Sequence, residues 1–118
     1  DIKDKKIFNN KNIVKVSVKE TFRKNNSSPA LTFFRNAEDF DEKITYHHIG
    51  IYQYEISTLK KFINLKQTEN EKKFRLEQLR ALDNGIPIDV IYTQNSPIGV
   101  DTMDDFMEIK KIMEYKKD

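Results

Sequence analysis

The chain has 118 residues and a formal net charge of +2, with 21 Lys and Arg against 19 Asp and Glu, and 37% of it is hydrophobic. Its length suits one modest domain or a piece of one, and its near balance of charge gives no support to nucleic-acid binding, which needs clustered as well as excess basic residues. The absence of cysteine excludes disulfides and thiolate chemistry, and no apolar run approaches the roughly 20 residues that span a bilayer, so we expect a cytoplasmic protein without membrane contact.

Two strands are predicted in the N-terminal part of the chain. Residues 13–18 alternate Val with Lys and Ser, which is the period-two pattern of a half-buried strand. Residues 24–29 are rich in Asn and Ser and are expected to turn. A second strand over 31–34 could then pair with the first as a hairpin-like unit. Residues 36–43 are acidic and polar without a period, which indicates a loop.

The segment 46–54 is the third predicted strand and the first that could carry chemistry. Side chains alternate along a strand, which would put His48, Tyr52 and Tyr54 on one face. That face is polar and aromatic, so His48 and Tyr52 could line one pocket and hydrogen-bond a hydroxyl or a carboxylate. Ordinary sheet packing is the alternative, because a lone histidine is more often a satisfied structural residue.

Two amphipathic helices are predicted next. Ile56, Leu59 and Phe62 recur at helical spacing. A second helix is predicted over 69–82, followed by Gly85, which supplies the usual left-handed stop. Two helices therefore follow the third strand.

One more strand and one more helix complete the prediction. Residues 86–92 form the strand, and Thr102 can cap the last helix with Asp105 three residues later. The buried stripe of that helix would consist of Phe106, Ile109 and Met113. The resulting order of elements predicts an α/β fold in which helices pack on a mixed sheet.

Asp101 is the sharpest single candidate for chemistry. It follows Gly99 in a predicted turn and precedes a helix, where a carboxylate can project toward a ligand. The alternative is a plain helix-start carboxylate, since the helix dipole alone favours one by about 0.3 to 1 kcal/mol. A metal site also needs more than one ligand.

Three further polar residues are candidates. Arg35 ends the second predicted strand with a guanidinium suited to a carboxylate, or simply solvated there. Glu77 and Gln78 lie in the second predicted helix, where Glu77 and Arg80 are three residues apart and could merely pair at the surface. The phosphate-loop pattern GxxxxGK[ST] and GxGxxG are absent from the sequence, so no segment is predicted to cradle a triphosphate.

Three islands of sequence, in this order, resemble the C-terminal half of 3-deoxy-manno-octulosonate cytidylyltransferase (CMP-KDO synthetase). They are YHHIGIYQY at 46–54, RLEQLRALDNG at 75–85 and IGVDT at 98–102. NNKNIVKVSV and ALTFFR extend the resemblance to roughly residues 9–114. It implies that residues 1–118 form a single partial domain, the C-terminal sugar-binding and dimerisation half of a nucleotide-diphospho-sugar transferase-like fold, in a family whose members are usually homodimers.

The resemblance also implies an activity. Such enzymes transfer CMP from CTP to 3-deoxy-D-manno-octulosonate (KDO), giving CMP-KDO and pyrophosphate for lipopolysaccharide biosynthesis, with Mg²⁺ as cofactor. By this similarity Arg35 would hold the KDO carboxylate, and the sugar would be contacted by His48, Tyr52, Glu77 and Gln78. Asp101 would ligate Mg²⁺, and no residue is assigned as catalytic.

The sequence departs from the family pattern at several points. The N-terminal stretch of the family, with its basic phosphate loop, cytidine pocket and other metal aspartate, has no counterpart in the sequence. Phe34 stands where a serine usually precedes the arginine, AEDF at 37–40 replaces an Ile-Pro segment, and Met103 replaces a proline. We therefore expect activity only with a complementing N-terminal half from another polypeptide or from a segment outside this sequence.

The sequence also allows two alternatives to the C-terminal half of an active enzyme. One is a catalytically inactive remnant or dimerisation module that lacks the CTP-binding half. The other is a small basic nucleic-acid binder, which rests only on lysine content. It would require Lys60, Lys61, Lys72 and Lys73 to share one face with exposed aromatic side chains.

Overall fold

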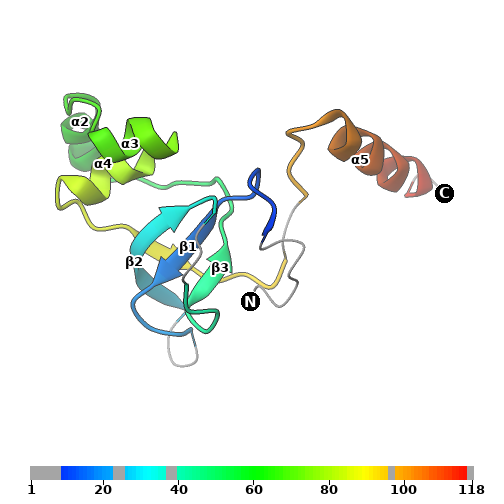
Figure 1. Cartoon of the computed structure of the whole chain (residues 1–118), viewed down its shortest axis with the longest axis horizontal. Coiled ribbons are helices and arrows are strands. Elements are labelled where there is room, and N and C mark those ends of the chain that lie inside the picture. Colours follow the sequence, from blue (N-terminus) through cyan, green and yellow to red (C-terminus); the bar gives the residue numbers. More distant parts are fainter. Residues whose placement is uncertain (1–8, 23–25, 37–39, 96–97, 117–118) are drawn as a thin grey trace.

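The computed structural model of the chain describes residues 9–22, 26–36, 40–95 and 98–116 (Figure 1). Four strands form one sheet in the order β3-β1-β2-β4. They are β1 (Lys15–Val18), β2 (Ser27–Phe34), β3 (Thr45–His47) and β4 (Asp89–Ile91). The α/β class with helices against a sheet is confirmed. A mixed sheet was expected, whereas the three strand pairings of the described residues are all antiparallel.

β1 lies inside the sheet and is buried along its whole length. Val16 and Val18 pack into the hydrophobic core. The alternate residues are polar but satisfied: the Lys15 ammonium donates to the main-chain oxygen of Arg35 at 2.6 Å, and the hydroxyls of Ser17 and Thr45 are hydrogen-bonded at 2.9 Å. The strand that the alternating pattern predicted is therefore confirmed, but both of its faces are covered.

The expected pairing of the first two strands is confirmed, since β1 and β2 run antiparallel. The predicted turn over 24–29 is wrong for residues 27–29, which already belong to β2. Their partner is β4, with Ser28 opposite Val90. That partner lies some sixty residues along the chain, so local Asn and Ser content gave no sign of it. Of the rest of the predicted turn, residue 26 does form a bend, and residues 24 and 25 lie outside the described residues.

The third predicted strand is wrong beyond its first residues. β3 is limited to Thr45–His47, and one further main-chain contact joins the His48 N–H to the Val14 oxygen at 3.0 Å. β1 begins at Lys15, so the sheet offers no partner to the residues after His48. The chain leaves the sheet there and crosses to the helices without regular structure.

Three short helices gather beside the sheet, at the upper left of Figure 1. They are α2 (Ile56–Ile63), α3 (Glu69–Phe74) and α4 (Gln78–Asp83). The single helix predicted over 69–82 is wrong, because Arg75 adopts a left-handed conformation (φ 54°) that separates α3 from α4. This conformation is unfavourable for a residue other than glycine, because its Cβ comes too close to the following carbonyl oxygen. It is offset here by Leu76, which the break turns into the core, where it is buried.

The ends of α3 and α4 follow sequence rules. Thr68 and Glu71 form a reciprocal capping box at the start of α3. α4 ends at Asp83, and the predicted left-handed stop follows at Gly85 (φ 72°). The Gly85 N–H donates to the Leu82 oxygen at 3.0 Å, and the next N–H donates to the Ala81 oxygen at 2.9 Å. These two bonds satisfy carbonyls that the end of the helix would otherwise leave unpaired.

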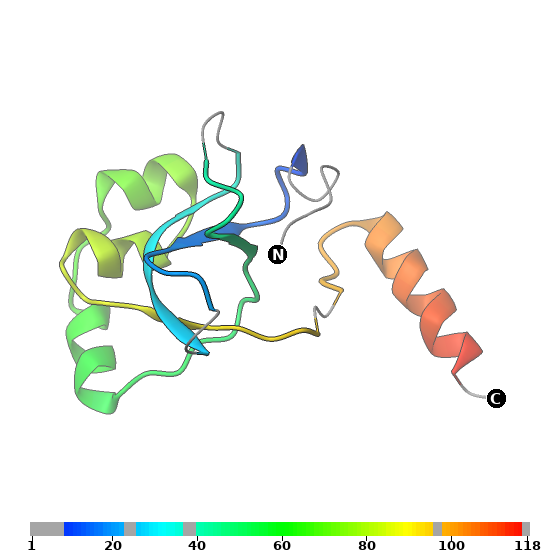
Figure 2. The same cartoon turned by 90° about the horizontal axis from the view of Figure 1, so that it is seen from below.

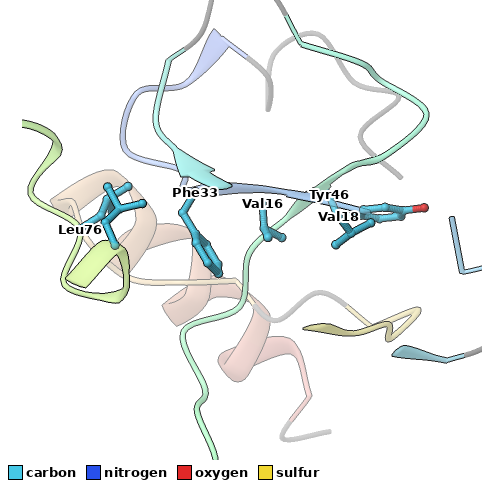
Figure 3. Packing of buried hydrophobic residues seen from close by; sticks show 6 residues of the cluster. Val16, Val18, Phe33, Tyr46 and Leu76 are labelled. Carbon is cyan, nitrogen blue, oxygen red and sulfur yellow. The ribbon is translucent and has the colours of Figure 1, made fainter. Parts of the chain in front are cut away.

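One hydrophobic cluster joins the sheet to the helices (Figure 3). Leu76 and Phe33 lie at its helix side, Val16 lies in the middle, and Val18 and Tyr46 lie at the other end. Because the cluster fixes β2 against the start of α4, it sets the position of every candidate residue on those elements.

α5 (Met103–Tyr115) stands away from the sheet in both views (Figures 1 and 2). Its predicted cap is confirmed: the Asp105 N–H donates to the Thr102 hydroxyl at 3.2 Å, and the Thr102 N–H donates to the Asp105 carboxylate at 2.9 Å. Its predicted buried stripe is wrong, since Phe106 and Met113 are exposed and only Ile109 is half-buried. No other described element covers the helix. Among the described helices, none combines the length and apolar character that a membrane span requires.

Candidate functional site

His48 and Tyr52 form the centre of the candidate site. The Tyr52 hydroxyl and His48 Nε2 are hydrogen-bonded at 2.8 Å. His48 is held from two sides, by its main-chain bond to Val14 and by the edge-on ring of Phe33 at 5.4 Å between ring centroids. The side chains of His48 and Tyr52 thus lie together, whereas the prediction that they line one pocket stays a prediction. They meet because the chain bends after β3, and not because they alternate along a strand.

A row of four rings runs from the sheet to the helices, and we call it the aromatic row. It consists of His48, Tyr52, Tyr54 and Phe62. Successive ring centroids are 5.5, 6.3 and 6.0 Å apart, which are normal distances for aromatic pairs. The row therefore ties the crossing segment to α2.

Two members of the row, His48 and Tyr52, are held in their neutral forms. Burial, and secondarily the charge of His47, lowers the pKa of His48 below its ordinary 6.5. Burial, followed by the charges of Tyr54 and Glu77, raises the pKa of Tyr52. A neutral imidazole and a neutral phenol are suited to hydrogen-bonding hydroxyl groups.

The lowered pKa of His48 predicts a pH dependence of folding. The unfolded chain protonates His48 near pH 6.5, before the folded chain does, so folding stability is fully present above about pH 6.5 and falls as the pH drops through the folded value. The pKa of His47 is also lowered, by burial and then by Lys15, and acts with the same sign. Imidazole NMR titration and urea unfolding at several pH values measure this.

The control for that experiment is the double substitution of His47 and His48 by glutamine, which should flatten the stability profile between pH 7 and 5. A His48 imidazole that titrates above pH 6.5 would contradict the prediction.

Arg80 closes the aromatic row at the helix side. Its guanidinium carbon lies over the Phe62 ring at 4.9 Å from the centroid. Its Nε donates to the Glu71 carboxylate at 2.8 Å, and its NH2 group contacts the other oxygen of that carboxylate. The Glu77 carboxylate is further away, at 3.7 Å. The surface pairing considered for Glu77 and Arg80 is thus the weaker of the two ion pairs that Arg80 makes.

The ion pair between Glu71 and Arg80 shifts the pKa of both partners. The hydrogen bond from Arg80 is the first cause of a lowered pKa of Glu71, and the same bond raises the pKa of Arg80. Glu71 was not among the predicted residues, because it lies nine residues from Arg80 and reaches it only through the left-handed turn at Arg75. The capping-box pattern Thr68-x-x-Glu71 was the one local signal that marked it.

A shallow depression of about 350 Å³ opens beside this ion pair. It is lined by Gln67, Glu71, Lys72, Arg75, Leu76, Glu77 and Arg80. The side chain of Glu77 is 71% exposed, whereas that of Glu71 is 6% exposed. Of the two carboxylates next to Arg80, only Glu77 is available to a ligand.

The other predicted residues lie outside this cluster of contacts. Gln78 is half-buried at the first position of α4. Arg35 follows β2, and its guanidinium makes a long 3.4 Å contact with the Asn12 oxygen. Asp101 is exposed before α5, where its N–H donates to the Asp105 carboxylate at 3.1 Å. Within the described part of the chain, no three His, Asp or Glu side chains are grouped so that they could hold a metal ion.

Searches by sequence and by fold both find similar proteins of one kind. No family model matches the chain. The 3-deoxy-manno-octulosonate cytidylyltransferase of Bartonella bacilliformis is 41% identical over 105 residues, which cover 89% of this chain and 42% of the relative. The Brucella ovis protein of the same name is 43% identical over 96 residues, covering 81% of this chain and 38% of the relative.

A solved structure is similar as well. It is that of a CMP:2-keto-3-deoxy-manno-octonic acid synthetase in complex with CTP, with a TM-score of 0.72 and 29% sequence identity. The match covers 91% of this chain and 44% of that one. The chain thus spans less than half the length of the relatives that it matches, and the matched portion is their C-terminal part.

Proposed function

Because this chain is homologous to the C-terminal part of the 3-deoxy-manno-octulosonate cytidylyltransferases, we propose that it supplies the sugar-acid side of CMP transfer from CTP to KDO. The products of that reaction are CMP-KDO and pyrophosphate. The CTP-binding side would come from a polypeptide segment equivalent to the N-terminal half of the relatives. As a soluble biosynthetic step, the reaction is proposed to take place in the cytoplasm.

The observation that carries the proposal is the meeting of residues from two separate islands of the sequence. His48 and Tyr52 are hydrogen-bonded, and the aromatic row continues from them through Phe62 to Arg80, which lies 3.7 Å from the Glu77 carboxylate. A neutral donor-acceptor pair beside an accessible carboxylate suits a polyhydroxylated ligand, because each hydroxyl can donate to one group and accept from another.

Each predicted residue has a proposed role at the sugar. His48 and Tyr52 hydrogen-bond hydroxyl groups, Glu77 accepts from a further hydroxyl, and Gln78 assists through its amide. Arg35 holds the carboxylate of the sugar acid with its forked guanidinium. These residues bind and orient KDO so that its anomeric hydroxyl can attack the α-phosphorus in line, and such positioning carries much of the catalysis of a transfer at phosphorus.

Asp101 fits one ligand position for Mg²⁺. Its carboxylate is exposed, whereas the carboxylate of Asp105 is already engaged by the two N–H groups of the α5 cap. Mg²⁺ is commonly held by one or two carboxylates together with substrate phosphates, so a single aspartate from this chain suffices once the nucleotide is bound. The ion supplies charge neutralisation at the phosphate oxygens.

The test is pyrophosphate release with CTP, KDO and Mg²⁺, measured for the chain alone and for the chain mixed with the N-terminal half of a relative. We expect turnover only in the mixture, and we expect Asp101→Ala to lower it by roughly 100-fold or more. Asp104→Ala is the matched control, because Asp104 lies in the first turn of the same helix and takes no part in the cap.

A second candidate function is a non-catalytic dimerisation module, and one observation favours it. α5 presents uncovered apolar side chains to solvent, namely Phe106, Met107, Ile112 and Met113. A folded chain that gives no turnover in the mixture, and that sediments as a dimer, would overturn the enzymatic proposal in favour of this one.

A further inference from the structure

Arg80 lies between two carboxylates that differ in burial. It forms a two-pronged ion pair with Glu71, and it approaches Glu77 only to 3.7 Å. Two-pronged pairs between arginine and a carboxylate are among the strongest polar contacts in proteins. The guanidinium is therefore committed to the buried partner and leaves the exposed one largely unengaged.

Glu71 is built into the fold so that it can hold this position. Besides Arg80, its carboxylate accepts from the main-chain N–H of Thr68 at 3.3 Å and from the amide of Gln67 at 3.4 Å. The Thr68 contact is half of the capping box of α3. Glu71 thus cannot move without loosening the start of that helix.

The geometry also says where Arg80 would turn if the charge of Glu71 were lost. Its side chain is only 12% exposed, so its charge is not freely hydrated, and an unpaired buried charge is strongly unfavourable. The Phe62 ring covers its guanidinium from one side. Glu77 is the carboxylate already within ion-pair distance, so a small rotation would bring the two together.

We propose that Glu71 is a positioning residue that keeps Arg80 away from Glu77, so that the Glu77 carboxylate stays available to accept hydrogen bonds from the hydroxyl groups of the sugar acid. This inference rests on the proposed function for the role of Glu77. It adds that the affinity for the sugar depends on Glu71 as well, although the buried Glu71 carboxylate does not contact the ligand. Loss of the Glu71 charge converts Glu77 from a ligand contact into a partner of Arg80.

Glu71→Gln tests this, because glutamine keeps the capping box while removing the charge. In the reconstituted enzyme the KM for KDO is expected to rise about 10-fold, the typical effect of losing one charged hydrogen bond, with the KM for CTP unchanged. A purely structural role for Glu71 would alter both constants together. An unchanged KM for KDO would overturn the inference.

A second measurement needs no sugar. In thermal unfolding of the chain alone, Glu77→Gln is expected to change the midpoint by at most about 2 °C, because the pair is exposed and long. In the Glu71→Gln background the same substitution is expected to lower the midpoint several-fold more, since Arg80 then depends on Glu77. Equal effects of Glu77→Gln in both backgrounds would contradict the proposed switch of partner.

The two measurements separate the two proposals. If wild type neither binds nor turns over KDO, the proposed function fails, and the thermal coupling alone decides whether Glu71 controls the partner of Arg80. If wild type turns over KDO and Glu71→Gln leaves its KM unchanged, only the present inference fails. Should Glu71→Gln not fold, Glu71→Asp keeps the charge but shortens the reach, and a smaller selective rise in the KM for KDO is expected.

Discussion

Replacing Glu71 by alanine is expected to lower the thermal unfolding midpoint of this chain by roughly 10 °C or more. Alanine removes both the capping-box acceptor at the start of α3 and the partner of a largely buried arginine. Breaking such a pair costs much more than the pair contributes, because the remaining charge stays largely buried and the exposed Glu77 compensates it only in part. Because this pair is one of the contacts that join α3 to α4, the depression beside Glu77 should change shape as well.

Glu69→Ala is the matched control. Glu69 lies in the same first turn of α3, but its side chain is 94% exposed and its only described ion pair is with the exposed Lys72 at 3.4 Å. Such a surface pair contributes little. Circular dichroism melts of both variants compare them directly, and a Glu71→Ala variant that melts within about 2 °C of Glu69→Ala would contradict the importance given to the buried pair.

Phe33→Ala is expected to destabilise the chain by about 3 to 5 kcal/mol, the usual range for removing a buried aromatic ring. Phe33 is 3% exposed, and its ring packs in the cluster between β1 and α4 (Figure 3). A loss of this size is comparable with the entire stability of many small domains. The same ring also packs edge-on against His48, so its removal should free the imidazole.

Urea unfolding measures the change in free energy, and the imidazole NMR signals report the freed histidine. Leu31→Ala is the control on the same strand, because Leu31 is 54% exposed. It is expected to cost less than about 1 kcal/mol. If Leu31→Ala and Phe33→Ala destabilise equally, the cluster drawn in Figure 3 does not determine the stability of the fold.

The site is predictable from the sequence only in part. The islands of sequence indicated His48, Tyr52 and Glu77 by resemblance. Of these, His48 and Tyr52 are hydrogen-bonded in the fold, whereas the depression beside Glu77 is lined by neither of them. Arg80 and Glu71 were not predicted as partners, because their pairing depends on a left-handed turn at Arg75. Sequence rules predict that conformation for glycine or asparagine, and not for arginine. The roles proposed for all six candidate residues stay predictions, since the contacts of their side chains in the structure do not test ligand binding. They are Arg35, His48, Tyr52, Glu77, Gln78 and Asp101.

Elements that depend on near neighbours in the chain could be predicted from the amino-acid sequence alone. The alternating Val residues of β1, the capping box of Thr102 and Asp105, and the stop at Gly85 follow from steric and hydrogen-bonding rules that act within a few residues. Tertiary structure decided everything that depends on a distant partner. β2 starts earlier than predicted because β4 pairs with its first residues. β3 ends earlier than predicted because β1 begins at Lys15 and offers no partner beyond it. The apolar face of α5 stays exposed because no described element packs on it, and a periodic pattern specifies a face but not what covers that face.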